Sequence, residues 1–458
     1  MLRITKLSNF YFILLFSFIP ISIFLGSTAS LVNLFLILIG LFLLYETGLL
    51  VFSFKDRAFL SLMILYLYLI FNSFFSLNFE IGFLRNFGFI RFILLFLVIN
   101  LLFYKKFEFK KVFKFWLIIF SIFVFDIIFE FYNGHNILGF ESENKKRIVS
   151  FFKDEQVVGA FLNGFGFILI GYLFNRYEKF SNKQKIFLFL FLITFVSSMI
   201  FSGERSNTIK LIIGLMIFFY LNDKINLKQK LFFLFSVILI FTLTFLNVTE
   251  IKHRYGKDLI NHIKDKEKRE RILYFQIYKS AFAIFKEYPI TGVGNKNYRV
   301  VSCGGTYELA CSTHPHQIYF EFLSEHGILG TLILLSIIFY LIFKNYSKML
   351  VKRNLLQISC FCYLIVNFIP ILPGGSFFAD FNATFFWINF SIFYASNFHT
   401  NIFSDFKIKG IAGNEKVKTY YNANKNSVQK FKNADIFNLE KNLPSFLYKI
   451  PYEILSMA

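Results

Sequence analysis

The sequence predicts an all-α integral membrane protein that crosses the bilayer about twelve times. Hydrophobic residues make up 56% of the 458 residues, aromatic residues make up 21%, and 71 residues are Phe. A soluble domain lacks the interior volume to bury so much aromatic surface. The apolar residues also gather in blocks of roughly 16 to 22, about the length that crosses a ~30 Å hydrocarbon core as a helix.

Each predicted span is one of these apolar blocks. In chain order the blocks cover residues 10–26, 31–53, 58–77, 86–103, 113–132, 157–174, 186–201, 208–221, 231–246, 318–343, 355–371 and 381–396. No convincing cleavage site follows the basic start of the chain, so we expect the first block to be a retained span.

Basic residues between the blocks predict which side each connection faces. The formal net charge is +21, and the Lys and Arg residues fall mainly in alternate short connections. They are Arg3, Lys6, Lys55, Arg57, Lys105, Lys106, Lys110, Lys111, Lys114, Arg176, Lys179, Lys183, Lys185, Lys224, Lys228, Lys230, Lys344, Lys348, Lys352 and Arg353. The positive-inside rule places these connections and both termini in the cytoplasm. The charge therefore indicates contact with anionic membrane lipid and not with nucleic acid.

The opposite, outer face receives the remaining connections, which are 78–85, 133–156, 202–207, 247–317 and 372–380. The connection 247–317, before the tenth span, is far longer than the others, and loops of that length usually carry function. Helix formers and spaced apolar residues between Asp265 and Lys286 predict one or two helices against the membrane surface. We therefore expect a membrane domain over 1–396 that includes this loop, and a polar cytoplasmic tail over 397–458.

Two histidines stand where the long loop meets the tenth span. Pro315 suits the first turn of a helix, with Thr313 or His314 as its cap, which places His316 in that first turn. The positive end of the helix keeps His316 neutral and able to accept a proton. Three interpretations stay open: a reactive histidine, interfacial polar residues that cap a span, or a metal site with His314, His316 and Glu321 as ligands. The spacing matches no known metal-binding pattern, so we expect no metal.

A second feature is a set of arginines on the outer face, where the positive-inside rule predicts few. Arg205 lies in the shortest outer connection, with Lys210 in the span that follows it. The others are Arg85, Arg91, Arg147, Arg254, Arg269, Arg271 and Arg299. Guanidinium groups form bidentate hydrogen bonds to phosphate, so this set indicates a phosphate or diphosphate binder.

Four cysteines fall into two pairs. Cys303 and Cys311 flank a polar stretch of the long outer loop, where we expect a disulfide because the compartment is oxidising. Cys360 and Cys362 lie within an apolar block and are expected to be inert.

The order of these motifs resembles the O-antigen ligase and O-antigen polymerase superfamily. The resemblance covers roughly residues 10–396 in topology and is sharpest across 288–330. The motifs that carry it are Arg-Ile-Val-Ser (147–150), Gly-Glu-Arg-Ser (203–206), Tyr-Pro-Ile-Thr-Gly-Val-Gly (288–294), His-Pro-His-Gln (314–317) and Glu-His-Gly-Ile-Leu-Gly (325–330). Gln317 stands where the superfamily usually has Asn, a departure that keeps an amide.

The resemblance implies an inverting, metal-independent glycosyltransferase of the GT-C type that uses no cofactor. Such an enzyme moves a glycan from undecaprenyl diphosphate to an acceptor, here lipid A–core, at the periplasmic face of the bacterial inner membrane. His316 would be the catalytic histidine and Arg205 and Arg271 the diphosphate-binding arginines, with Arg147 and Arg85 as weaker matches. His314, Gln317, Glu321 and Glu325 would support them.

Other functions remain open on the sequence alone. A polymerase that joins repeat units and a relative that glycosylates protein share these motifs, and we favour the ligase. A transporter or flippase of lipid-linked glycan is the alternative of a different class. A transporter should show internal repeat symmetry, which the sequence does not display, and does not need the long outer loop.

Overall fold

The computed structural model describes residues 6–44, 56–141, 147–153, 157–257, 272–304 and 310–404. Across these residues every regular element is a helix, and none is a strand. The chain divides into two units, Met1–Ile402 and Phe403–Ala458. The predicted tail lies almost wholly outside the described residues, but residues 397–402 belong to the first unit, where Asn401 Nδ2 donates to the Asn100 carbonyl at 2.9 Å.

The first half of the chain forms α1 to α9. The elements are α1 (Lys6–Phe24), α2 (Ser27–Ile39), η1 (Gly40–Leu44), α4 (Arg57–Ser73), α5 (Phe79–Gly88), α6 (Ile90–Tyr104), α7 (Phe109–Asn133), η2 (Ser150–Phe152), α8 (Val158–Phe174), η3 (Tyr177–Lys179) and α9 (Asn182–Phe201).

The second half begins with the helix that Arg205 opens. Its elements are α10 (Arg205–Leu221), α11 (Leu227–Asn247), α12 (Thr249–Lys252), η4 (His253–Lys257), α15 (Leu273–Glu287), α16 (Tyr298–Ser302), α17 (Ile318–Phe343), α18 (Tyr346–Lys352), α19 (Leu355–Asn367) and α20 (Asp380–Ala395). Each predicted apolar block overlaps a helix within the described residues, and residues 45–53 of the second block lie outside them.

Seven helical segments within the described residues are long and apolar enough to cross a membrane. They are Lys6–Phe24, Ser27–Leu44, Phe79–Tyr104, Phe109–Asn133, Asn182–Phe201, Leu227–Asn247 and Ile318–Lys352. Three shorter apolar helices accompany them, α4, α8 and α19. The chain is therefore an all-helical, multi-pass membrane protein, and the count of about twelve spans stays a prediction.

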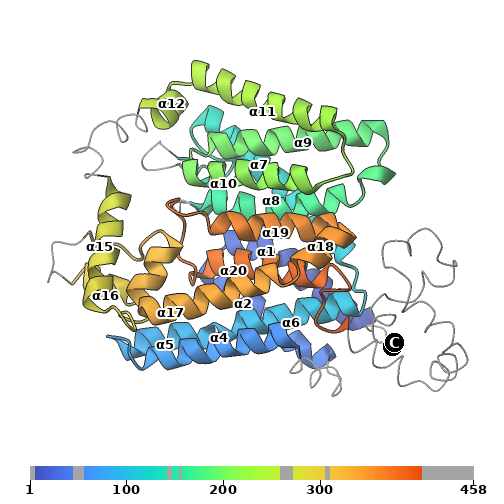
Figure 1. Cartoon of the computed structure of the whole chain (residues 1–458). Coiled ribbons are helices and arrows are strands. Elements are labelled where there is room, and N and C mark those ends of the chain that lie inside the picture. Colours follow the sequence, from blue (N-terminus) through green and yellow to red (C-terminus); the bar gives the residue numbers. More distant parts are fainter. Residues whose placement is uncertain are drawn as a thin grey trace, which may run out of the picture. The chain divides into compact units, whose positions relative to one another are not determined.

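The centre of the first unit is built on close contacts between α8, α19 and α20. Glycines in α8 permit these contacts: a Cβ on Gly171 would lie 2.7 Å from the Leu355 carbonyl oxygen, and one on Gly164 would lie 2.8 Å from Phe385. Small residues at such crossings let helix backbones approach in the absence of a hydrophobic driving force between helices. In contrast, most of the side chains of α11 are exposed, at the edge of the bundle (Figure 1).

The predicted outer connections meet at one end of the bundle, which we call the histidine end. Asn78 N donates to Asn297 Oδ1 at 2.8 Å, and Ile148 N donates to the Ser202 carbonyl at 3.3 Å. Gly374 N donates to the His316 carbonyl at 2.7 Å. Figure 1 shows α15 and α16 at the same end, beside the start of α17.

The lysine-rich connections meet at the other end. Lys224 Nζ donates to the Asn175 carbonyl at 3.3 Å, and Leu355 N donates to Asn175 Oδ1 at 2.8 Å. Arg353, between α18 and α19, forms an ion pair at 2.9 Å with Asp223, between α10 and α11. The alternation of charge along the sequence therefore sorts the connections into the same two groups as the fold does.

Candidate functional site

The helix α17 is broken at its tenth residue. Gly327 has φ 62° and ψ −170°, which separates a first segment, Ile318–His326, from the rest of the helix. The backbone groups released at the break find partners in the loop that precedes α16. Val293 N and Gly294 N donate to the carbonyls of Ser324 and Glu325 at 3.0 and 2.8 Å. A broken helix at membrane depth is tolerated only where its backbone is satisfied inside the protein, as it is here.

Further hydrogen bonds between the same two segments have their donors on α17. Ile328 N and Leu329 N donate to the carbonyls of Pro289 and Ile290 at 2.8 and 3.3 Å. A side chain at Gly292 is excluded, because its Cβ would lie 2.4 Å from the Glu325 backbone. The Tyr-Pro-Ile-Thr-Gly-Val-Gly motif therefore serves as the segment that fills the break in α17.

The helix α15 packs on the first segment of α17. Its buried residues Ile277, Ala281 and Ile284 form a small core with Val293, Tyr298 and Val301. The predicted helix within 265–286 is thus present from Leu273, and residues 258–271 lie outside the described part. One face of α15 packs against the protein through Ile277, Ala281 and Ile284, while Phe282 is exposed.

The tenth predicted block, 318–343, has the bounds of α17, but the structure corrects the prediction that Pro315 and His316 lie in its first turn. Pro315 and His316 precede the helix, whose first residue is Ile318. His316 has φ 56°, which is incompatible with a helical first turn. Gln317 is the N-cap, since its Oε1 accepts from Tyr319 N and Phe320 N at 2.8 and 3.1 Å. The sequence argument missed this cap because Gln is not among the preferred N-cap residues.

The two histidines lie against each other at the histidine end. Their ring centroids are 3.9 Å apart, and the Tyr274 ring of α15 meets His316 edge-on at 5.4 Å. Burial, and next the neighbouring His316, lower the pKa of His314 to about 3. Burial lowers the pKa of His316, the Gly374 backbone partly offsets this effect, and Arg147 lowers it further. Both imidazoles are therefore neutral at pH 7, because of burial and cations rather than helix position.

Arg85 and Arg91 meet at a carboxylate that the sequence argument did not single out. Asp380, the first residue of α20, lies 2.5 Å from Arg91 Nη2 and 3.6 Å from Arg85 Nη1. The Arg85 guanidinium also interacts electrostatically with His314 and Glu321. One carboxylate shared by two guanidinium groups leaves a net positive charge. A clue in the sequence was an acid at the outer border of the last span.

Three further cations come from other connections. Arg147 precedes η2 and acts electrostatically on His316. Arg205 is the first residue of α10, and the next residue, Ser206, donates from Oγ to the Pro373 carbonyl. Lys210, one turn further along α10, places Nζ 3.1 Å from the position that a Cβ on Gly374 would occupy. Gly374 N itself donates to the His316 carbonyl, so Lys210 and His316 both lie against the loop that contains Gly374.

Buried carboxylates fix the loops that carry these groups. Glu321 accepts from Ser376 Oγ and Phe377 N at 2.5 and 2.9 Å, which orders the turn after Gly374. Glu130 accepts from Val149 N and Ser150 N at 3.0 and 2.6 Å, which orders the turn after Arg147. Glu325 accepts weakly from Tyr298 N at 3.4 Å. Glu321 and Glu325 therefore position loops and are not placed to exchange protons with a substrate.

The remaining predicted residues separate into two cases. Cys303 and Cys311 are joined by a disulfide at the base of the loop that leads to the histidines. Arg269 and Arg271 lie outside the described residues, as does the side chain of Arg254. Arg299 is exposed on α16.

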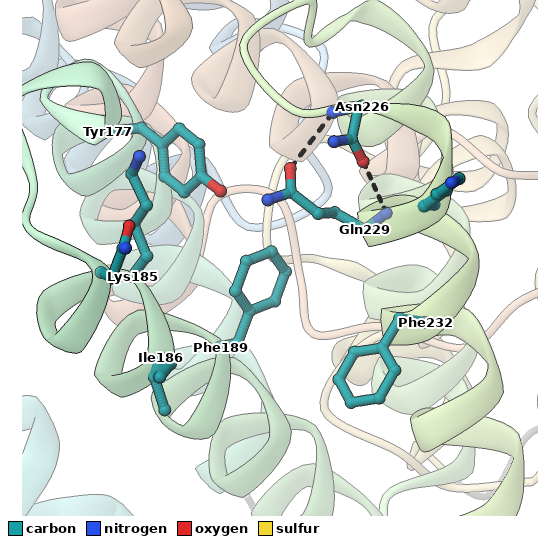
Figure 2. Close-up of a pocket in the computed structure, with 9 residues that line it drawn as sticks. Tyr177, Lys185, Ile186, Phe189, Asn226, Gln229 and Phe232 are labelled. Atoms are coloured by element: carbon teal, nitrogen blue, oxygen red, sulfur yellow. Dashed lines mark hydrogen bonds between the residues drawn. The ribbon is translucent and has the colours of Figure 1, made fainter.

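Neither a candidate metal cluster nor the hollow described below coincides with this site among the described residues. Among the described residues, no group of three His, Cys, Asp or Glu side chains could hold a metal ion. A hollow of about 560 Å³ opens at the lysine-rich end, between the first turns of α9 and α11 (Figure 2). It is lined by Tyr177, Asn182, Lys185, Ile186, Phe189, Asn226, Lys228, Gln229 and Phe232. None of these residues belongs to the histidine end.

The fold and the site define a multi-pass helical membrane protein that holds two neutral histidines among arginines and a lysine at one end. Residues 189–335 match the family described as O-antigen ligase. The predicted resemblance to the O-antigen ligase superfamily is thereby confirmed over that segment, which includes Arg205, Lys210 and both histidines. No curated protein matches the chain. The family match supports a lipid-linked glycan and an acceptor as partners in general terms.

Proposed function

We propose that the protein is an O-antigen ligase-like glycosyltransferase, which moves a glycan from undecaprenyl diphosphate to a lipid A–core acceptor. The observation that carries the proposal is the neutral His316 beside Arg147 and within the segment that matches the O-antigen ligase family. The proposed site faces the periplasm of the bacterial inner membrane, with both termini in the cytoplasm. The gathering of lysine-rich connections at the opposite end supports this orientation.

His316 accepts the proton of the acceptor hydroxyl in the proposed reaction. The hydroxyl oxygen attacks the anomeric carbon of the donor, and the bond from that carbon to the diphosphate oxygen breaks. The electron pair stays on the diphosphate, and attack from the face opposite to the leaving group inverts the anomeric centre. The lowered pKa of His316 keeps the imidazole unprotonated before the attack, which a general base requires.

The arginines stabilise the negative charge that develops on the leaving diphosphate. Fixed guanidinium groups do this without a metal ion, because their charge and donors are already in place when the bond breaks. Arg205 and Arg271 bind the diphosphate in this proposal, and Arg147 and Arg85 contribute at its edge. Tyr274, three residues after Arg271, contacts the His316 ring. His314, Gln317, Glu321 and Glu325 support the site by packing, capping and loop positioning.

The lipopolysaccharide of a deletion strain tests the proposed acceptor. Loss of a ligase leaves lipopolysaccharide without O-antigen, because no glycan reaches lipid A–core. Loss of a polymerase, which shares the family match, leaves lipopolysaccharide with a single repeat unit. Full-length O-antigen in the deletion strain would contradict both reactions.

A cysteine in place of Lys286 on α15 should react with an impermeant maleimide from the periplasm.

Purified protein tests the roles of His316 and Arg205. His316→Ala should transfer glycan roughly 10²–10⁴-fold more slowly, because a positioned base contributes about that factor, and should still bind the donor. Arg205→Lys should also transfer poorly, since Lys cannot form a bidentate contact with phosphate. EDTA should leave the rate unchanged. Normal transfer by His316→Ala, or EDTA inhibition reversed by a divalent cation, would contradict the mechanism.

A further inference from the structure

Lys210 is a buried cation that the proposed mechanism does not use. It lies five residues after the start of α10, which is about 7.5 Å along the helix axis. Its side chain is only 5% exposed. The Gly374 backbone lies next to its ammonium group, and Gly374 N donates to the His316 carbonyl at 2.7 Å. Lys210 therefore reaches the histidine loop from within the bundle.

The part of the chain that the structure describes supplies no direct partner for this charge. Among the described residues, Lys210 forms neither a hydrogen bond nor an ion pair, and Glu204 acts on it only through space. The Glu204 carboxylate is engaged by Gly159 N at 2.9 Å and by Asn207 Nδ2 at 2.5 Å. Burying an ammonium group without a partner is costly, and a buried charge in a membrane protein indicates a functional site.

We propose that Lys210, beside the Gly374 backbone, is a phosphate-binding residue that contacts one phosphate of a polyprenyl-diphosphate-linked donor. This inference rests on the proposed function. Neighbouring groups are suited to the same ligand. Arg205 is the first residue of the same helix, and Ser206 Oγ donates to the carbonyl of Pro373, the residue before Gly374. An ammonium group binds phosphate as a point charge, which complements the planar fork of a neighbouring arginine.

The absence of a Cβ at residue 374 is part of this arrangement. A Cβ there would lie 3.1 Å from Lys210 Nζ, closer than an ordinary van der Waals contact. Glycine therefore allows the ammonium group to lie flush against the loop that carries His316. The same closeness links phosphate binding to the position of the proposed base.

Binding and unfolding of the full-length protein in nanodiscs test the inference. The probes are undecaprenyl diphosphate, undecaprenol as the uncharged analogue, and phosphatidylglycerol as a phosphate from bulk lipid. Lys210→Met should bind undecaprenyl diphosphate roughly 10- to 100-fold more weakly, as expected for one lost charge-assisted contact, and undecaprenol equally well. Lys210→Arg should retain most of the affinity. The control is Lys224→Met at the lysine-rich end, which should bind as wild type.

Thermal unfolding separates a binding role from a structural role. Without ligand, Lys210→Met should unfold at the wild-type temperature or above it, because an apolar side chain replaces an unpaired buried charge. It should lose the rise in Tm that undecaprenyl diphosphate produces in wild type. Unchanged affinity in Lys210→Met, or an equal Lys210-dependent rise with phosphatidylglycerol alone, would overturn the inference. If His316→Ala transferred normally, the proposed mechanism would fail while the measured role of Lys210 in binding stood.

Discussion

Two segments flank the first part of α17, and they are held in different ways. The segment Tyr288–Asn297 is fixed by backbone hydrogen bonds to the break in α17 and by asparagines, such as Asn295 Nδ2 on Asn86 Oδ1 at 2.7 Å. The segment Ser312–Gln317 is held by few backbone bonds and lies among cations. Two polar atoms are buried without partners among the described residues here: His314 Nε2 within the segment, and Nε of its neighbour Arg85.

The difference separates scaffold from site. Backbone pairing and glycines give Tyr288–Asn297 one permitted conformation, and this segment fixes the direction of the first part of α17. Buried polar atoms without partners among the described residues border both segments, because Asn72 Oδ1 and Ser76 Oγ lie beside Tyr288–Asn297. The histidine segment differs in the cations gathered around it and in the lowered pKa values of its histidines, which typically mark a functional site. The comparison predicts that changes in the first segment act on folding and that changes in the second act on chemistry.

The largest expected effect belongs to the scaffold segment. Gly292→Ala should destabilise the protein by on the order of 2–4 kcal/mol, because φ is 68° and the new Cβ would meet the Glu325 backbone at 2.4 Å. Gly134→Ala is the matched control, since Gly134 has φ 81° with nothing within 4 Å of its Cβ. It should cost only about 1–2 kcal/mol of backbone strain. Equal losses of Tm in the two variants would contradict the close docking of Tyr288–Asn297.

The sequence predicted the scaffold in outline. Apolar block length located the helices because burial and the bilayer both select for long apolar runs. Charge alternation grouped the connections correctly because each group lies at one end of the bundle. The break at Gly327 was not predictable, since Glu-His-Gly-Ile-Leu-Gly continues an apolar pattern and a lone glycine is compatible with helix. Only the docked segment, about thirty residues earlier in the sequence, makes the break stable.

The sequence also indicated which end of the bundle several candidate site residues reach. Arg85, Arg147, Arg205, His314 and His316 all reach the histidine end, as their outer connections indicated. The partners of these residues come from distant helices, so Asp380 and the loop contacts of Glu321 had no local signature. The start of α17 was predicted wrongly because proline at a first turn was weighed above a side-chain cap by Gln317. The functional roles of all these residues stay predictions, and Arg271 lies outside the described residues.

A smaller effect is expected from Arg147, and it concerns pH. Burial lowers the pKa of His316 most and Arg147 lowers it further, so the proposed general base stays neutral as the pH falls below the usual histidine range. Arg147→Gln should raise that pKa, and the acid limb of kcat/KM should move to higher pH. Arg299→Gln, an exposed change on α16, should leave the limb in place. An unmoved limb in Arg147→Gln would show that Arg147 does not act on His316.

The smallest effect is expected from the disulfide, which lies between the two segments. The bond between Cys303 and Cys311 closes a loop with a sequence separation of 8, so its entropic contribution is about 2–3 kcal/mol at most. Other contacts hold the same loop ends: Ala310 N donates to Ser280 Oγ at 2.9 Å, and Ser302 Oγ donates to the Ser312 carbonyl at 3.3 Å.

The double variant Cys303→Ser, Cys311→Ser should therefore lower Tm slightly and slow glycan transfer by less than about tenfold, as expected when neighbouring hydrogen bonds remain. Wild-type protein treated with a reductant should behave in the same way, and the double variant should not respond to the reductant. The buried thiols of Cys360 and Cys362 leave this comparison unaffected. A loss of transfer above 100-fold, with the fold intact, would show that the disulfide and not the hydrogen bonds positions the histidine segment.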